Sequence, residues 1–220
     1  MDWALQDRSC GTSKIVSPTL DSLEKLFQIQ IQNLISKRYP DAAGMSEEEF
    51  LLYVSPLKNK LAISKRLAGP GLNFVVIIPE SFVSIPKQIS LLNSGIEPVA
   101  NRSNSVCNDD MSGLTTPRTP YLAIDVQTKS EVQSGSPRQS LRRLQRAGRC
   151  GLTVAEGIAV VLHFPNTLSR SCFDLLGSRS MEDFPYLCRR TNGQIDLGFG
   201  DPDDADPRWV AASCYARLAA

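Results

Sequence analysis

The chain has 220 residues, of which 42% are hydrophobic and 21% are charged, and its formal net charge at pH 7 is +1. This near-neutral balance gives no strong field that would attract nucleic acid or anionic lipid. No apolar run approaches the roughly 18 residues that a membrane-spanning helix needs. The opening string MDWALQDRSC also lacks the basic region and apolar stretch of a secretion signal. We therefore expect a cytoplasmic protein with no membrane partner, and nucleic acid is an unfavoured partner.

The cysteines are widely spaced and form no CxxC pair. Such spacing fits neither a zinc knuckle nor the dense disulfide framework of a small secreted domain. Because no export signal is present, reduced thiols are predicted, as is usual in the cytosol. The sequence therefore indicates no metal site and no cofactor. The six positions are Cys10, Cys107, Cys150, Cys172, Cys188 and Cys214.

The N-terminal region begins with a polar, irregular stretch, so residues 1–16 are predicted to form a flexible arm. A helix follows over residues 17–40, with Ser17 as its cap and Pro18 at its first position. Pro40 is expected to end this helix. Its apolar residues recur at spacings of three and four, which predicts one buried stripe. The stripe consists of Leu20, Leu23, Phe27, Ile31, Leu34 and Ile35.

Two helices and a strand are predicted next. The capping box of Ser46 and Glu49 starts a helix, which Pro56 should kink or divide. Residues 73–79, NFVVIIP, are short, β-branched and bounded by glycine and proline, which predicts a fully buried strand. Residues 85–92, IPKQISLL, predict a short helix.

The middle of the chain changes character. Residues 93–119 are rich in Ser, Asn, Pro and Gly with little periodicity, so this segment is predicted to be a flexible insertion. A second strand is expected over residues 120–126, PYLAIDV, because proline suits the first position of a strand. Two further capping boxes then predict helices, one begun by Ser136 and one by Thr153.

The C-terminal region contains a hairpin signal. Two β-prone runs, PYLCRR and QIDLGFG, flank the pair Asn192 and Gly193. The run that follows, PRWVAASCYARL, predicts a closing helix. Because helices and strands do not alternate regularly, the α+β class is favoured. We expect one α+β domain over residues 17–220, with a helical N-terminal half packed on a small mixed sheet of about four strands that includes the C-terminal β-hairpin.

A set of strings between Leu152 and Cys214 carries a family resemblance. They are LTVAEGIAVVLHFP, FDLLGSR, PYLCRR and GQIDLGFGDPDDADPRW, and the strand PYLAIDV is a further match. With these residues the C-terminal half resembles an uncharacterised bacterial family of unknown function. The resemblance implies a bacterial, soluble, single-domain protein. It implies no activity, cofactor or catalytic residue.

Four aspartates crowd the string GFGDPDDADPRW. The spacing departs from a calcium-binding EF-hand loop, because alanines stand at positions 5 and 12 and an aspartate at position 6. A structural role is favoured, in which Asp206 caps the closing helix and the other acids lie near its positive end. A weak site for a hard cation such as Ca²⁺ or Mg²⁺ is the alternative. The four are Asp201, Asp203, Asp204 and Asp206.

Two residues are candidates for a base or a nucleophile. His163 is the only histidine, and it lies at a predicted helix end, where the helix dipole favours the charged imidazolium. Cys150 follows Arg149, and a positive neighbour can make a thiol reactive. Burial or capping is the favoured interpretation for both. No GxSxG, HExxH or Walker A pattern occurs.

The densest charge cluster is a basic helix face formed by Arg138, Arg142, Arg146 and Arg149. It could grip phosphates or an acidic protein partner, and a solvated helix face is the competing interpretation. We expect a non-catalytic binding or regulatory domain. The alternative is a small enzyme with a carboxylate or cysteine-based site near the C-terminal hairpin.

Overall fold

The computed structural model covers the chain in six described stretches. The predicted arm over residues 1–16 and most of the predicted insertion over residues 93–119 lie outside them, so both remain predictions. The described residues are 18–67, 69–95, 116–128, 135–169, 171–206 and 208–220.

The helices fall into two groups along the chain. The N-terminal group consists of α1 (Leu20–Ser36), α2 (Tyr39–Ala42), α3 (Glu47–Val54), the 3₁₀ helix η1 (Ser55–Lys60) and α4 (Leu61–Leu67). The others are α5 (Ile85–Leu92), α6 (Pro137–Arg146), α7 (Val154–His163) and the 3₁₀ helix η3 (Pro165–Leu168).

The strands form three sheets in the described part of the chain. A three-stranded antiparallel sheet has the order β1 (Leu72–Ile77), β2 (Tyr121–Val126), β9 (Ala216–Ala219). A mixed four-stranded sheet has the order β6 (Ile195–Gly200), β5 (Phe184–Arg189), β4 (Cys172–Asp174), β7 (Trp209–Ala211). A two-residue ladder joins β3 (Cys150–Gly151) to β8 (Ser213–Cys214).

The ends of the first helix differ from the prediction. Thr19, not Ser17, caps α1, because its side chain accepts a hydrogen bond from the backbone N–H of Ser22 at 3.1 Å. The helix ends before Pro40 because Arg38 adopts a left-handed conformation with φ 61°. Pro40 then lies in the first turn of α2, a position where its missing N–H is not needed.

The predicted second helix is confirmed, together with its division. Ser46 and Glu49 form a complete capping box at the start of α3, with bonds of 2.8 and 3.2 Å. Pro56 lies inside η1, where the α-helical pattern tightens and then resumes as α4. The proline therefore divides the helix as its ring geometry requires.

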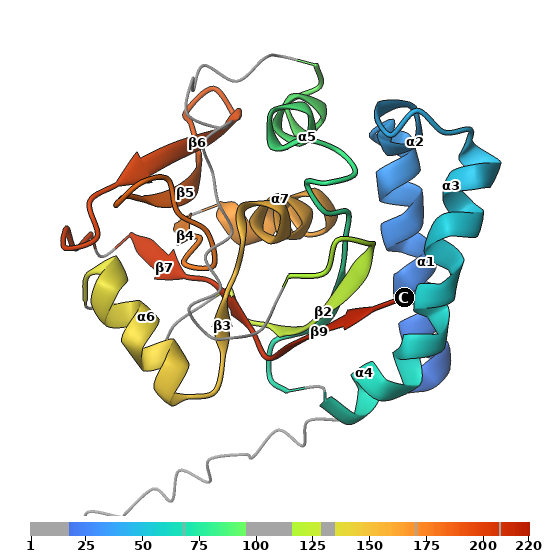
Figure 1. Ribbon diagram of the computed structural model, residues 1–220, viewed down its shortest axis with the longest axis horizontal. Helices are drawn as coiled ribbons and strands as arrows, with labels where there is room; N and C mark the ends of the chain where they lie inside the picture. Colours follow the sequence, from blue (N-terminus) through green and yellow to red (C-terminus); the bar gives the residue numbers. More distant parts are fainter. Residues whose placement is uncertain (1–17, 68, 96–115, 129–134, 170, 207) are drawn as a thin grey trace, which may run out of the picture.

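The three-stranded sheet is buried on both faces, which explains the unbroken apolar runs of β1 and β2. Side chains of Phe74 and Val76 point to a core shared with α1 to α4. Val75 and Ile77 point to the opposite core, which is shared with α7 and the four-stranded sheet. Figure 1 shows this layering, with the N-terminal helices on one side of the sheet and α7 on the other.

The predicted hairpin is confirmed. Strands β5 and β6 pair antiparallel from Phe184 opposite Gly200 to Arg189 opposite Ile195. Gly193 lies in the turn with φ 85°, which glycine adopts without the steric penalty of a side chain. The side chain of Asn192 accepts a hydrogen bond from the backbone N–H of Gln194 at 3.1 Å. The turn chemistry therefore sets the register of the two strands.

The predicted closing helix is wrong. The segment forms β7, β8 and β9, three short strands that pair with β4, β3 and β2. These partner strands lie far away in the sequence. The local periodicity of the segment therefore cannot predict the hydrogen bonds and the burial that they provide. Tertiary pairing therefore overrides the helical preference of this alanine-rich run. The α+β class is nevertheless confirmed.

The prediction of reduced thiols is also wrong for one pair of cysteines. Cys172 and Cys188 form a disulfide, with their Cα atoms 4.5 Å apart. They lie on the neighbouring strands β4 and β5, next to the directly paired residues Phe173 and Leu187. The separation of 16 residues gave no signal, because only the sheet register brings these two positions together.

Candidate functional site

A cavity of about 340 Å³ lies beside α6, between this helix and the segments that flank the four-stranded sheet. Guanidinium groups dominate its polar lining, and they come from two separate parts of the chain. The lining residues are Arg138, Leu141, Arg142, Gln145, Arg179, Glu182, Phe184 and Pro202.

The local sequence of α6 explains how its arginines reach the cavity. Ser136 caps the helix by accepting a bond from the backbone N–H of Gln139. On the buried side, Leu141 packs with Leu176 and Phe184 in a small apolar cluster. Because residues four apart share one helix face, Arg138 and Arg142 then line the cavity together.

The acidic loop, residues 201–206, holds one of these arginines. Both oxygens of Asp203 accept bonds from the guanidinium of Arg138, at 2.9 and 3.1 Å. The backbone N–H of Arg138 also donates to the carbonyl of Pro202 at 3.0 Å. The bond from Asp203 raises the pKa of Arg138. The acidic loop and the basic face of α6 are thus joined by the contact between Asp203 and Arg138.

The other two arginines differ in their surroundings. The guanidinium carbon of Arg179 lies over the ring of Phe184, 5.0 Å from its centroid. Arg142 is exposed and makes no hydrogen bond or ion pair within the described part of the chain. Its guanidinium is therefore available to a ligand in the cavity.

The remaining aspartates of the acidic loop serve its turns. Asp201 accepts a bond from the backbone N–H of Asp203 at 2.7 Å. Asp206 accepts one from the backbone N–H of Arg208 at 2.8 Å and pairs with the same side chain. These bonds lower the pKa of Asp206 to about 2. The predicted helix-capping role of Asp206 is wrong, because a strand and not a helix follows.

No cation cluster is found in this loop. Within the described residues, no group of three or more His, Cys, Asp or Glu side chains is placed to hold a metal ion. Asp204 is exposed and takes no part in the pairing of Asp203 with Arg138. The turn bonds and the arginine pairs engage oxygens of Asp201, Asp203 and Asp206.

The predicted basic face is incomplete, because Arg149 leaves it. Helix α6 ends at Arg146, and Arg149 follows a left-handed glycine at Gly148, φ 65°. Its guanidinium turns into the protein, where it donates to Asp125 at 2.6 Å and to the hydroxyl of Ser213 at 3.0 Å. The chain reversal after α6 therefore converts an expected surface arginine into a nearly buried one.

Asp125 has an unusual backbone as well as a buried charge. It lies in β2 with φ 49°, which is rare for a residue other than glycine. One of its oxygens accepts a bond from the backbone N–H of Gly71 at 2.9 Å. A Cβ atom added at Gly69 would lie 2.5 Å from the same carboxylate, so that glycine permits the close approach. These contacts of the Asp125 carboxylate thus maintain the strained backbone conformation of the residue.

His163 lies in the core and not in the cavity. Its Nε2 donates to the carbonyl of Val76 at 3.1 Å, while Nδ1 is buried with no partner in the described part of the chain. Burial lowers the pKa of His163 to about 4, against the smaller effect of the Val76 bond. The expected charged imidazolium is therefore wrong, since desolvation outweighs the helix dipole.

Cys150 is likewise remote from the cavity. It is 3% exposed and lies directly opposite Cys214 on the β3–β8 ladder. Hydrogen bonding to Cys150, followed by burial, raises the pKa of Cys214 well above its usual range. A thiol in such surroundings is rarely ionised while the core is closed, which disfavours a catalytic nucleophile of an enzyme at this position.

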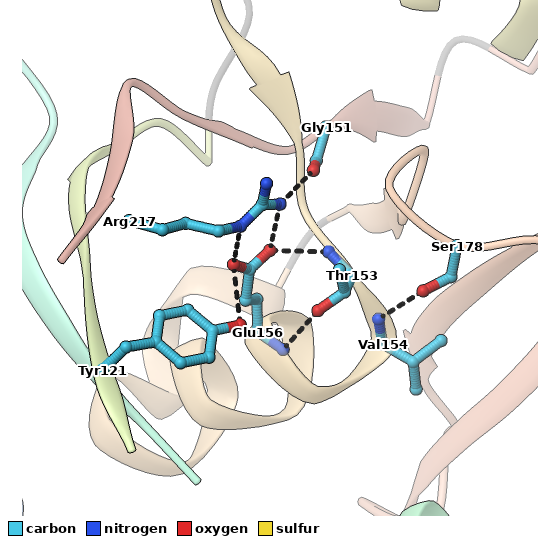
Figure 2. A network of polar contacts seen from close by, with 7 residues as sticks. All are labelled: Tyr121, Gly151, Thr153, Val154, Glu156, Ser178 and Arg217. Atoms are coloured by element: carbon cyan, nitrogen blue, oxygen red, sulfur yellow. Dashed lines mark hydrogen bonds and ion pairs between the residues drawn. The ribbon is translucent and has the colours of Figure 1, made fainter. Parts of the chain in front are cut away.

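The buried carboxylate of Glu156, which the sequence indicated only as part of a capping box, accepts hydrogen bonds from three different residues. The box is present, with Thr153 and Glu156 exchanging bonds of 2.7 and 3.3 Å. In addition, Arg217 forms a two-pronged ion pair with Glu156, at 2.6 and 3.0 Å, and Tyr121 donates to it at 2.9 Å. Figure 2 shows these contacts converging at the start of α7.

This network is sealed from solvent and therefore holds the fold and not a substrate. Glu156 and Tyr121 have no exposed surface. Arg217 also donates to the carbonyl of Gly151 at 3.2 Å, so the network ties together β2, β3, α7 and β9. Burial alone would lower the pKa of Arg217, but the Glu156 carboxylate raises it overall. The charge pair compensates the desolvation of both groups.

Asp174 is a second carboxyl that the sequence did not indicate. It lies in β4 opposite Tyr186, whose ring stacks on Trp209 with centroids 4.9 Å apart. Asp174 is 5% exposed and makes no side-chain hydrogen bond within the described residues. Burial, aided by the negative charge of Asp206, raises the pKa of Asp174 to about 7. An aspartate in a three-residue strand offers no sequence signal for this behaviour.

Comparison with known proteins places the chain in a family. The sequence profile of the "Family of unknown function (DUF5701)" matches residues 33–196, well over half of the chain. The chain belongs to this family. The match begins near the end of α1 and ends inside β6, so it covers α2 to α4, both buried strands and α6. The resemblance to a family of unknown function, seen in the C-terminal half, is thereby confirmed.

Searches of curated proteins and of solved structures identify no relative of the chain. No curated protein and no solved structure matches the chain significantly. Among the described helices, none combines the length and apolar character that crossing a membrane requires.

Proposed function

We propose that this DUF5701 member is a non-catalytic binding domain whose cavity beside α6 takes a small multivalent anion. One observation carries the proposal. Arg138 and Arg142 from α6, and Arg179 from the connection between β4 and β5, all line a single cavity. Guanidinium groups bind phosphate and carboxylate oxygens through two parallel hydrogen bonds, so converging arginines favour ligands of this kind.

The size and lining of the cavity narrow the ligand class. A volume of about 340 Å³ lies at the lower end of the range for small-molecule sites. The one aromatic side chain in the lining is Phe184, and Arg179 covers its ring. Base stacking is therefore unfavoured, and a phosphate ester or a polycarboxylate fits better than a nucleic acid. The carboxylate of Glu182 would repel ligands whose whole surface is negatively charged.

The balance of positive and negative charges in the cavity lining predicts only modest affinity for an anion. Asp203 already neutralises Arg138, and Glu182 adds a second negative charge to the lining. Arg142 is the arginine best placed to gain a new partner, because it makes no ion pair in the described part of the chain. Binding should therefore weaken with added salt, which screens exposed charges.

The competing enzyme interpretation has less support. Reactive groups of an enzyme should converge on one concave site. The cavity is lined by neither Cys150 nor His163, and none of the four aspartates of the acidic loop lines it. Among the described residues, burial raises the pKa of the carboxyls of Asp174 and Glu80, and neither of them lines the cavity.

Isothermal titration calorimetry with pyrophosphate, and separately with citrate, tests the proposal. We expect binding at low salt that Arg142→Ala weakens by at least about tenfold, the usual effect of losing a charged hydrogen-bonding partner. Arg146→Ala is the matched control, since Arg146 lies one turn further along α6 and outside the cavity lining. Its affinity should stay within about twofold of wild type. Equal losses in both variants, or no binding of either anion, would contradict the proposal.

An acidic segment of a partner protein is the second candidate occupant of the cavity, because its carboxylates offer the same chemistry.

A cytoplasmic location remains a separate prediction. The Cys172–Cys188 disulfide argues against it, since cytosolic thiols are usually kept reduced. Fractionation of the host cell, with the redox state of these two cysteines measured in the same extract, tests that prediction.

A further inference from the structure

The two cysteines of the β3–β8 ladder are neighbours in the core. Cys150 pairs directly with Cys214, and their side chains are hydrogen-bonded to each other. The residues are 3% and 0% exposed. Side chains of directly opposed residues lie on the same face of a ladder, so both sulfur atoms point into the same region of the core.

The ladder geometry suits a covalent bond between these thiols. The backbone N–H of Leu152 donates to the carbonyl of Ala212 at 3.0 Å, which continues the register of the ladder. Hydrogen-bonded pairs recur every second residue, so Cys150 and Cys214 occupy a pair of the same type. Cα atoms of such a pair are about 5.5 Å apart, within the range that a disulfide spans. Their Cβ atoms are further apart than in a non-hydrogen-bonded pair, so the two strands must shift slightly for the bond to close.

The same chain already contains a cross-strand disulfide. Cys172 and Cys188 are bonded across β4 and β5 and are half-buried. Conditions that maintain this bond therefore act on a protein that has a second, better-buried cross-strand pair, although Cys150 and Cys214 occupy a hydrogen-bonded position of their ladder and Cys172 and Cys188 a non-hydrogen-bonded one. The two pairs lie in different sheets, so each can be oxidised or reduced separately.

We propose that Cys150 and Cys214 are a redox-active dithiol that closes to a second cross-strand disulfide by exchange with a small-molecule disulfide such as oxidised glutathione. The thiolate of one cysteine attacks the oxidant, which releases one thiolate and leaves a mixed disulfide. The other cysteine attacks the protein sulfur of that mixed disulfide and displaces the second thiol. The two cysteine protons pass to the two released thiols, so the oxidant is reduced by two electrons and the protein is oxidised by two.

Burial sets the rate of this reaction. The raised pKa of Cys214 makes its thiolate scarce while the core is closed. The paired strands are two residues long, so a local opening could expose both thiols without global unfolding, but it would also have to break the bonds of Arg149 to Ser213 and of Arg217 to Gly151. Oxidation should therefore be slow in the folded protein and should speed up in mild denaturant.

The bond would secure the sealed network of Figure 2. Gly151 follows Cys150 and accepts a bond from Arg217, which lies three residues after Cys214. A covalent link between the two strands would restrict the opening that separates Arg217 from Glu156. It would also close a long loop that contains α7, which reduces the entropy of the unfolded chain. The oxidised protein should accordingly unfold at a higher temperature.

The test uses the full chain in which Cys172 and Cys188 are both replaced by serine, so that this disulfide makes no contribution. The protein is equilibrated with reduced and oxidised glutathione at several ratios, alkylated in denaturant and mapped by mass spectrometry. Mapping also separates the pair from Cys10 and Cys107, which lie outside the described residues. We expect a peptide cross-linked through Cys150 and Cys214, with a melting temperature several degrees above that of the reduced form.

The variant Cys214→Ser provides the control. It should show neither the cross-linked peptide nor the shift in melting temperature, and Cys150→Ser serves the same purpose if the first variant folds poorly. Full alkylation of both cysteines at every glutathione ratio would overturn the proposal. Cross-links that join either cysteine only to other positions would also overturn it.

Discussion

Arg217 and Glu156 form an ion pair in the interior of the protein, with Nε of the arginine 2.6 Å from Oε1 of the glutamate. The side chain of Arg217 is 5% exposed and that of Glu156 is not exposed at all. The arginine comes from the last strand, and the glutamate belongs to a helix cap 61 residues earlier. One carboxylate therefore completes a local capping motif and anchors the C-terminal strand.

Replacing Glu156 with glutamine should strongly destabilise the protein. The substitution preserves shape but leaves the buried guanidinium of Arg217 without a counter-charge. Removing one partner of a buried pair typically costs about 3–5 kcal/mol. Urea unfolding monitored by circular dichroism measures the loss. The matched control is Glu49→Gln, which alters the same capping motif in an exposed helix with no buried ion pair and should have a much smaller effect. Similar losses in the two variants would contradict the structural role of the pair.

Arg149→Lys tests the second buried pair. Lysine preserves the charge but cannot reach Asp125 and Ser213 at once with the geometry of a guanidinium. We expect a loss of about 2–4 kcal/mol in unfolding free energy, since hydrogen bonds to a buried charge are removed. Arg146→Lys, on the exposed face of α6, should leave stability nearly unchanged. If Arg149→Lys also left the unfolding free energy nearly unchanged, the inward position of Arg149 would be wrong.

Asp174 should make stability depend on pH. Its pKa is raised from 3.8 to about 7, so the folded protein holds this proton more tightly than the unfolded chain does. The stabilisation of the folded protein by protonated Asp174 is therefore complete below about pH 4 and is lost as the pH rises to about 7. A change of this size corresponds to at most about 4 kcal/mol.

Asp174→Asn removes the charge and should abolish this dependence. Relative to wild type, the variant should be clearly more stable at pH 8 and similar in stability at pH 4. Urea unfolding at several pH values measures the difference. Asp204→Asn, at an exposed position of the acidic loop, is the control and should follow the wild-type pH profile. Parallel profiles for Asp174→Asn and wild type would show that the Asp174 carboxyl titrates normally.

The acidic loop should bind no metal tightly. Three of its carboxylates, those of Asp201, Asp203 and Asp206, accept backbone bonds in turns or pair with Arg138 and Arg208. A cation would have to replace these partners, so calorimetric titration with Ca²⁺, Mg²⁺ and Mn²⁺ should detect no tight site. A micromolar dissociation constant that Asp203→Ala abolishes would reverse this prediction and favour the enzyme interpretation.

Local chemistry in the sequence determined several elements correctly. The capping boxes of Ser46 with Glu49 and Thr153 with Glu156 are present as predicted. The hairpin around Asn192 and Gly193 is also present, because the short loop over residues 191–193, which ends in a left-handed glycine, constrains its own neighbours. In each case the interacting groups lie within a few residues, so the sequence alone contains the relevant geometry.

Only the tertiary structure decided the rest. The C-terminal run has helical composition but forms strands, because β2, β3 and β4 supply partners from distant parts of the chain. Arg149 and Arg138 look alike in sequence, but one enters the core and the other lines a cavity. Burial, ion pairing and pKa depend on which atoms surround a group, and those atoms come from segments whose proximity no local pattern records.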